Sequence, residues 1–119
     1  MKNILRDMKE LWREDDLELA DHLSVTGGVR FPGYSHHAIY LGDDQVIHYQ
    51  NGEVRVDSLD AFRRGGELRV SDSVCTYSKE IIISRAYSRI GESNYNLLFN
   101  NCEHFVNWCR SGSSTTHGI

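Results

Sequence analysis

The sequence predicts an α+β fold in which an antiparallel sheet packs against a helix that begins at a cysteine. One observation is a β-hairpin pattern, because residues 34–41 and 45–50 read as strands on either side of a Gly-Asp turn. A second is the polar pair Asn100-Asn101, which opens directly into the amphipathic helical segment 102–109. At 119 residues the chain is large enough to bury a core, and residues 1–119 are predicted to form one domain.

Three elements are predicted before the hairpin. Residues 2–13 read as a helix, because their apolar residues recur at helical spacing, and the segment that follows, through residue 16, is an acidic connection. We expect the apolar face of this helix to pack on the domain rather than on a membrane. Alternation over 22–26 predicts a strand, and the glycine-rich residues 27–33 predict a loop that leads into the hairpin.

Turn, cap and alternation signals predict four further elements, which are a strand over 53–56, a helix over 59–63, a strand over 67–73 and a helix over 79–90. Asp57 or Ser58 caps the first of these helices, and Ser78 caps the second. Core positions of the second helix are predicted to be Ile81, Ile82, Ala86 and Ile90. The apolar segment 95–99 is expected to pack before the cysteine, and residues 111–119 to form a disordered tail.

Cys102 is predicted to occupy the first position of the last helix. Asn101 suits the N-cap, so the thiol lies beside unpaired backbone N–H groups and the positive end of the helix dipole. Such a position lowers the pKa of a thiol and favours the thiolate, which attacks carbonyl carbon. The alternative is an inert, buried cysteine, as most free cysteines are. On the reactive interpretation, Cys102 should be alkylated before the other thiols.

The hairpin adds two histidines on one face. A strand alternates its side chains, so His36 and His37 point to opposite faces. His36 and His48 flank the turn at similar distances, and antiparallel pairing therefore brings them to neighbouring positions of adjacent strands. A cysteine nucleophile needs an imidazole as base and acid, and that imidazole needs an orienting partner. This hairpin can supply both.

Three motifs carry a family resemblance: His-His-Ala-Ile-Tyr-Leu-Gly-Asp from His36, Val-Ile-His ending at His48, and Asn-Cys-Glu-His-Phe-Val around Cys102. Together they resemble the lecithin–retinol acyltransferase family, which includes the H-Ras-like suppressor phospholipase/acyltransferases and short bacterial members. The resemblance spans residues 21–110. It implies a circularly permuted papain-like fold, with Cys102 as nucleophile, His36 as base and His48 as the histidine that orients it. His37 stands where relatives often carry an aromatic residue, and no role is assigned to it.

The resemblance also implies a function. It points to a thiol-dependent acyltransferase or phospholipase A-type hydrolase that forms an acyl thioester on Cys102, with a glycerophospholipid as the acyl-bearing substrate. Two alternatives remain open: a thiol peptidase or amidase of related fold, and a non-enzymatic interaction module like the small viral proteins that keep these motifs. The intact trio of His36, His48 and Cys102 counts against the second alternative.

Other kinds of site are not favoured. The spacing of the histidines and cysteines matches no compact zinc motif, so neither a metal nor a cofactor is expected. His104 lies about 200° around the helix from Cys102, and Glu103 is explained by the helix dipole. Neither residue is expected to be catalytic.

Charge, hydropathy and cysteine count indicate which partners and which cellular compartment to expect. The formal net charge is −4 with acidic and basic residues interleaved, which argues against nucleic acid. No apolar run approaches the roughly 18 residues of a membrane span, and the first 20 residues are charged throughout, so only transient membrane contact is expected. Three cysteines is an odd count, which favours reduced thiols and a cytoplasmic protein. Cys102 and Cys109 lie roughly 10 Å apart on one helix, beyond disulfide reach.

Overall fold

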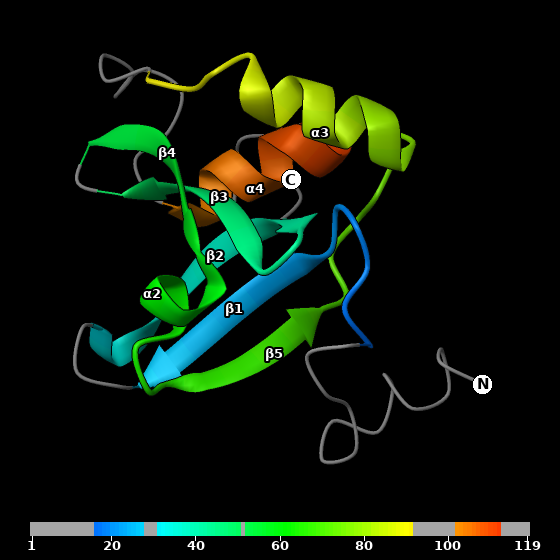
Figure 1. The fold of residues 1–119 in the computed structure, drawn as a ribbon. Coiled ribbons are helices and arrows are strands. Elements are labelled where there is room, and N and C mark those ends of the chain that lie inside the picture. Colours follow the sequence, from blue (N-terminus) through cyan, green and yellow to red (C-terminus); the bar gives the residue numbers. More distant parts are fainter. Residues whose placement is uncertain (1–15, 28–30, 51, 92–101, 113–119) are drawn as a thin grey trace.

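A computed structural model describes residues 16–27, 31–50, 52–91 and 102–112. In chain order its elements are β1 (His22–Gly27), β2 (Phe31–Gly42), β3 (Gln45–Gln50), β4 (Glu53–Ser58), α2 (Leu59–Arg63), β5 (Glu67–Ser71), α3 (Lys79–Tyr87) and α4 (Cys102–Ser111). The strands form one sheet in the order β4-β3-β2-β1-β5, and every neighbouring pair is antiparallel (Figure 1). The predicted α+β class, with an antiparallel sheet packed against the helix that carries Cys102, is confirmed.

The sheet separates two apolar cores, one on each face. Helices α3 and α4 lie together on one face, and α2 lies on the other (Figure 1). Successive residues of β2 enter different cores, so that Ile39 packs with α4 whereas Ala38 packs with α2. By the same alternation, β2 presents His37 toward the α4 face and His36 toward the α2 face.

Buried apolar residues fill both cores. The core on the α4 face contains Ala20, Ile39, Ile47, Val54, Ile82, Ala86, Phe105, Val106 and Cys109. The core on the α2 face contains Leu17, Leu23, Val25, Ala38, Tyr40, Val46, Leu59, Phe62 and Leu68.

The strand that carries His36 and His37 is longer than the sequence suggested. Residues 31–33 were expected in a loop, but β2 begins at Phe31, because β1 provides an antiparallel partner as far as the Gly27–Phe31 pair. The register of β1 against β2 shifts between Thr26 and Gly27. The hairpin itself is confirmed, with Ile39 opposite Ile47 and Gly42 opposite Gln45.

The helices differ from expectation at their ends. Ser58 rather than Asp57 caps α2, since its Oγ accepts a 3.0 Å hydrogen bond from the N–H of Ala61. Helix α3 ends at Tyr87 instead of residue 90. Ser111 belongs to α4 and not to the predicted tail.

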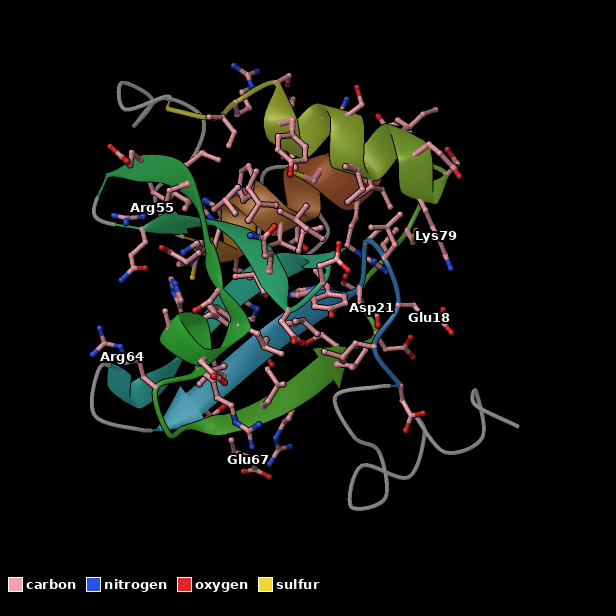
Figure 2. The ribbon with its side chains drawn as sticks, viewed as in Figure 1. Glu18, Asp21, Arg55, Arg64, Glu67 and Lys79 are labelled. Atoms are coloured by element: carbon pink, nitrogen blue, oxygen red, sulfur yellow. The ribbon has the colours of Figure 1, made fainter. Side chains whose placement is uncertain are left out.

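The predicted core of α3 is half right. Ile82 is 1% exposed and Ala86 is fully buried, but Ile81 and Ile90 are 48% and 45% exposed. The helix is apolar on more than one side, and only the side that faces α4 and the sheet is covered. At its start, Lys79 Nζ lies 3.3 Å from Glu18 Oε1, which joins α3 to the segment before β1 (Figure 2).

Some predictions lie outside the described residues. These are the helix over 2–13, the segment 95–99, the cap Asn101 and the tail beyond residue 112. Within the described ranges, no helix is long and apolar enough to cross a membrane.

Candidate active site

Cys102 lies where the start of α4 meets β2, the central strand of the sheet. Its Sγ accepts a hydrogen bond from the backbone N–H of His37 at 3.3 Å. Helix α4 is held in this position by Phe105 and Val106, which are fully buried against the sheet. The sulfur therefore sits at the backbone of the strand residue that follows His36.

The thiol of Cys102 is more weakly acidic than its helix position suggested. Burial raises the pKa of Cys102 to about 11, and the charge of Glu103 raises it further, whereas backbone N–H groups of His37, Cys102 and Glu103 lower it. The expectation of a lowered pKa was wrong in direction, because desolvation outweighs the helix-start N–H groups. Cys102 is consequently a neutral thiol near pH 7, and a base must remove its proton during attack.

His36 and His48 form a hydrogen-bonded pair on the α2 face. His36 Nε2 and His48 Nδ1 lie 2.8 Å apart, and the two residues are 4% and 1% exposed. The ring of Phe62 from α2 packs on both imidazoles, with centroid distances of 5.3 Å to His36 and 5.6 Å to His48. The neighbouring positions expected from the hairpin are thus confirmed, although the catalytic roles of the pair stay predictions.

Asp57 is a member of this cluster that the sequence reasoning missed. Its Oδ2 lies 2.7 Å from His48 Nε2, and Arg55 Nε lies 3.1 Å from the same oxygen (Arg55 is labelled in Figure 2). Burial on its own raises the pKa of Asp57, but the hydrogen bond and charge of His48, together with Arg55, hold it below its usual value. The available signal was strand periodicity, since Asp57 falls on the same face as Arg55 once β4 is extended to Ser58.

A second histidine pair lies on the α4 face. His22 Nε2 and His37 Nδ1 are 2.8 Å apart, and His22 Nδ1 lies 2.8 Å from Ser73 Oγ. Arg110 Nε donates to Ser73 Oγ at 3.0 Å, and His37 Nε2 lies 4.0 Å from Glu103 Oε1. The chain of contacts joins both ends of α4 to the sheet.

The second pair is uncharged near neutral pH. Burial lowers the pKa of His22 to about 3, with smaller contributions from the charges of His37 and Arg110. Burial also lowers the pKa of His37, against the opposing charge of Glu103. His37 and Glu103, to which no role was assigned from the sequence, therefore take part in holding the helix that carries Cys102.

Cys75 is exposed, Cys109 is buried, and neither forms a disulfide with Cys102. Burial raises the pKa of Cys109 well above its ordinary value. In the part of the chain that the structure describes, no group of three His, Cys, Asp or Glu side chains could hold a metal ion.

Comparison with known proteins identifies relatives. The family model described as lecithin retinol acyltransferase matches residues 15–115. Rat lecithin retinol acyltransferase is 29% identical over 115 residues, covering 67% of this chain and 50% of that protein. Human phospholipase A and acyltransferase 4 is 31% identical over 106 residues (69% of this chain, 65% of that protein), and human phospholipase A and acyltransferase 1 is 33% identical over 108 residues (71% and 64%). The chain spans about half the length of the rat lecithin retinol acyltransferase. With the family model matched over most of its residues, this chain belongs to the lecithin retinol acyltransferase family.

Proposed function

We propose that this protein is a cysteine-dependent acyltransferase or acyl hydrolase that takes an acyl group from a glycerophospholipid onto Cys102. The observation that supports the proposal is the contact between Cys102 Sγ and the backbone N–H of His37, the residue that follows the paired histidine His36 in β2. The names of the relatives, acyltransferases of lecithin and retinol and phospholipases A, support acyl chemistry on lipids.

The first half of the reaction forms a thioester. Cys102 Sγ attacks the ester carbonyl carbon while His36 removes the thiol proton. Because burial raises the pKa of Cys102 to about 11, this proton transfer belongs to the attack and does not precede it. His36 then returns the proton to the departing alcohol oxygen, which releases a lysophospholipid and leaves the acyl group on sulfur.

The second half regenerates the thiol. His36 accepts a proton from the incoming acceptor, whose oxygen or nitrogen attacks the thioester carbonyl, and the proton returns to sulfur as the thioester breaks. Water as acceptor gives a hydrolase, whereas an alcohol or amine gives a transferase. Backbone N–H groups at the start of α4 would stabilise the tetrahedral oxyanion in both halves.

The order of these groups in the chain agrees with a circularly permuted papain-like arrangement. The histidines lie on β2 and β3, and the cysteine follows on the last described helix, α4. His48 would hold the His36 ring in place, the role that an Asp or Asn has in other triads. A cytoplasmic protein that meets lipid transiently fits this proposal.

The test is direct detection of the acyl-enzyme. The full chain is mixed with dihexanoylphosphatidylcholine, quenched in acid after seconds, and weighed intact. A mass gain of one hexanoyl group, mapped to the Cys102 peptide, is expected for the native chain and for Cys75→Ser. Release of lysophospholipid at an undiminished rate by Cys102→Ser would contradict the thioester. Cleavage of peptide or amide substrates, with no cleavage of the phospholipid, would identify a thiol peptidase or amidase instead.

A further inference from the structure

We propose that Asp57 is a positioning residue that sets the protonated nitrogen of both His48 and His36, so that neutral His36 carries its proton on Nε2 and its basic lone pair on Nδ1. The predicted effect of Asp57 on the reaction rate rests on the function proposed above. The predicted protonation sites of the two histidines rest only on the contacts among these three side chains.

The three residues form a line on the α2 face of the sheet. Asp57 Oδ2 lies 2.7 Å from His48 Nε2, and His48 Nδ1 lies 2.8 Å from His36 Nε2. His48 faces His36 from β2, Asp57 and Arg55 from β4, and the uncharged ring of Phe62 from α2. With His48 only 1% exposed, both of its nitrogens make their contacts inside the protein.

The direction of each hydrogen bond follows from the chemistry of the end group. An ionised carboxylate has no hydrogen to give, so His48 Nε2 must carry the proton and donate it to Asp57. A neutral imidazole has one N–H, so His48 Nδ1 is then bare and accepts. His36 Nε2 must therefore donate, which leaves the lone pair of neutral His36 on Nδ1.

Without the carboxylate this order is no longer fixed. His48 could then carry its proton on Nδ1 and donate it to His36 Nε2. His36 would hold its own proton on Nδ1 and could not take one from the thiol there. The distinction matters here because Cys102, with its pKa raised to about 11, requires a base in the attack step.

The residues around Asp57 favour a role in positioning the two histidines over a role in capping helix α2. Arg55 Nε lies 3.1 Å from Oδ2, which keeps the carboxylate ionised beside His48. Helix α2 does not need Asp57 as a cap, since Ser58 performs that function. Asp60, three residues further on in α2 and exposed, offers a control carboxylate.

The first experiment reads the tautomers and needs no substrate. The full chain is labelled with ¹⁵N-histidine, and the ring nitrogens are observed by NMR above the titration of the histidines, with signals assigned through His36→Gln and His48→Gln. Both rings are expected to be protonated on Nε2 in the native chain and in Asp60→Asn. In Asp57→Ala, a fraction of His48 should shift to the Nδ1–H form. A native His48 protonated on Nδ1 would overturn the inference, whatever the activity.

The second experiment measures dihexanoylphosphatidylcholine cleavage against pH. Asp57→Asn keeps the size of the side chain but can donate to His48 Nε2 and so favours the wrong tautomer. We expect a loss in kcat of roughly 10- to 100-fold with little change in KM, comparable to the loss of carboxylates behind metal-bound histidines. Asp57→Glu, which restores an acceptor, should recover part of the rate.

The pH profile separates positioning from a general weakening of the fold. A carboxylate stabilises the imidazolium form, so its removal should move the acid limb of kcat to lower pH. Asp57→Asn within twofold of the native kcat, with an unmoved acid limb, would overturn the inference. If the native chain cleaves no acyl ester, the proposed function fails, while the NMR spectra still decide the role of Asp57.

Discussion

The backbone N–H of His37 donates to Cys102 Sγ at 3.3 Å, so the candidate nucleophile is fixed to the residue next to the candidate base. This contact joins the start of α4 to the backbone of β2 and involves no side chain of the strand. The same strand residue uses its ring on the α4 face, where His37 Nδ1 meets His22. His37 therefore contacts the start of α4 through its backbone and β1 through its ring, whereas the ring of His36 packs on Phe62 of α2.

Loss of either reacting group should abolish turnover while the fold remains. Cys102→Ser and His36→Ala are each expected to lower kcat by at least about a thousandfold. Removing one member of a catalytic unit costs almost as much activity as removing all of its members. Cys75→Ser is the control and should keep native activity, because that thiol is exposed. Rates on dihexanoylphosphatidylcholine and circular dichroism decide the matter. Substantial activity in Cys102→Ser would remove the thioester from the mechanism.

The thiols should react with iodoacetamide in the order Cys75, Cys102, Cys109. Cys75 is exposed, whereas burial raises the pKa of Cys102 to about 11 and shields Cys109 completely. Only the thiolate reacts, so Cys102 labelling should accelerate as the pH rises toward that value. This order reverses the sequence-based expectation that Cys102 reacts first.

Peptide mapping of briefly labelled protein measures the order, and labelling in guanidinium, where all three thiols are accessible, provides the control. Faster labelling of Cys102 than of Cys75 at neutral pH would show a thiolate held by a protonated His36. The general-base step proposed for the attack would then be wrong.

The parts of the site that the sequence predicted come from local patterns. The turn between β2 and β3 sets the hairpin register, and that register brings His36 and His48 together on one face. The start of α4 at Cys102 follows in the same way from a polar segment before an amphipathic one.

The missed parts depend on contacts between distant segments or on burial. His22 reaches His37 only because β1 pairs with β2 in one particular register. The pKa of Cys102 depends on how much of the domain covers the thiol, which no local pattern gives. The sequence predicts this strand only to residue 56, so Asp57 is one of two candidate helix caps there, whereas β4 extends to Ser58.

His48 should tolerate an amide better than a methyl group. His48→Gln can still accept a hydrogen bond from His36 Nε2, whereas His48→Ala leaves that nitrogen without its partner from β3. We expect His48→Ala to lose roughly 10²- to 10⁴-fold in kcat, the usual range for an acid–base partner, and His48→Gln to lose clearly less. Steady-state rates with thermal melts as the folding control test this. Equal losses would indicate that His48 itself transfers a proton.

The stability of the domain should fall as the pH is lowered below the ordinary titration range of histidine. The pKa of His22 drops from 6.5 to about 3 on folding, chiefly through burial. Between these pKa values the unfolded chain binds a proton that the folded chain excludes. The free energy of unfolding therefore falls by at most about 1.4 kcal/mol for each unit by which the pH is lowered, as far as this group is concerned. Stability from His22 is fully present above pH 6.5 and declines toward pH 3.

The variant His22→Gln separates this group from the carboxylates, because it keeps a polar side chain beside Ser73 and His37 but cannot titrate. Its unfolding free energy at neutral pH should be lower than that of the native chain, since an amide replaces the two contacts of the ring imperfectly. Its decline between pH 6.5 and 4 should be shallower by up to about 1.4 kcal/mol per pH unit. Urea unfolding at several pH values provides the measurement. Parallel pH dependences for the two proteins would show that His22 takes up its proton over the same pH range in the folded and unfolded chain, and the buried neutral pair on the α4 face would have to be abandoned.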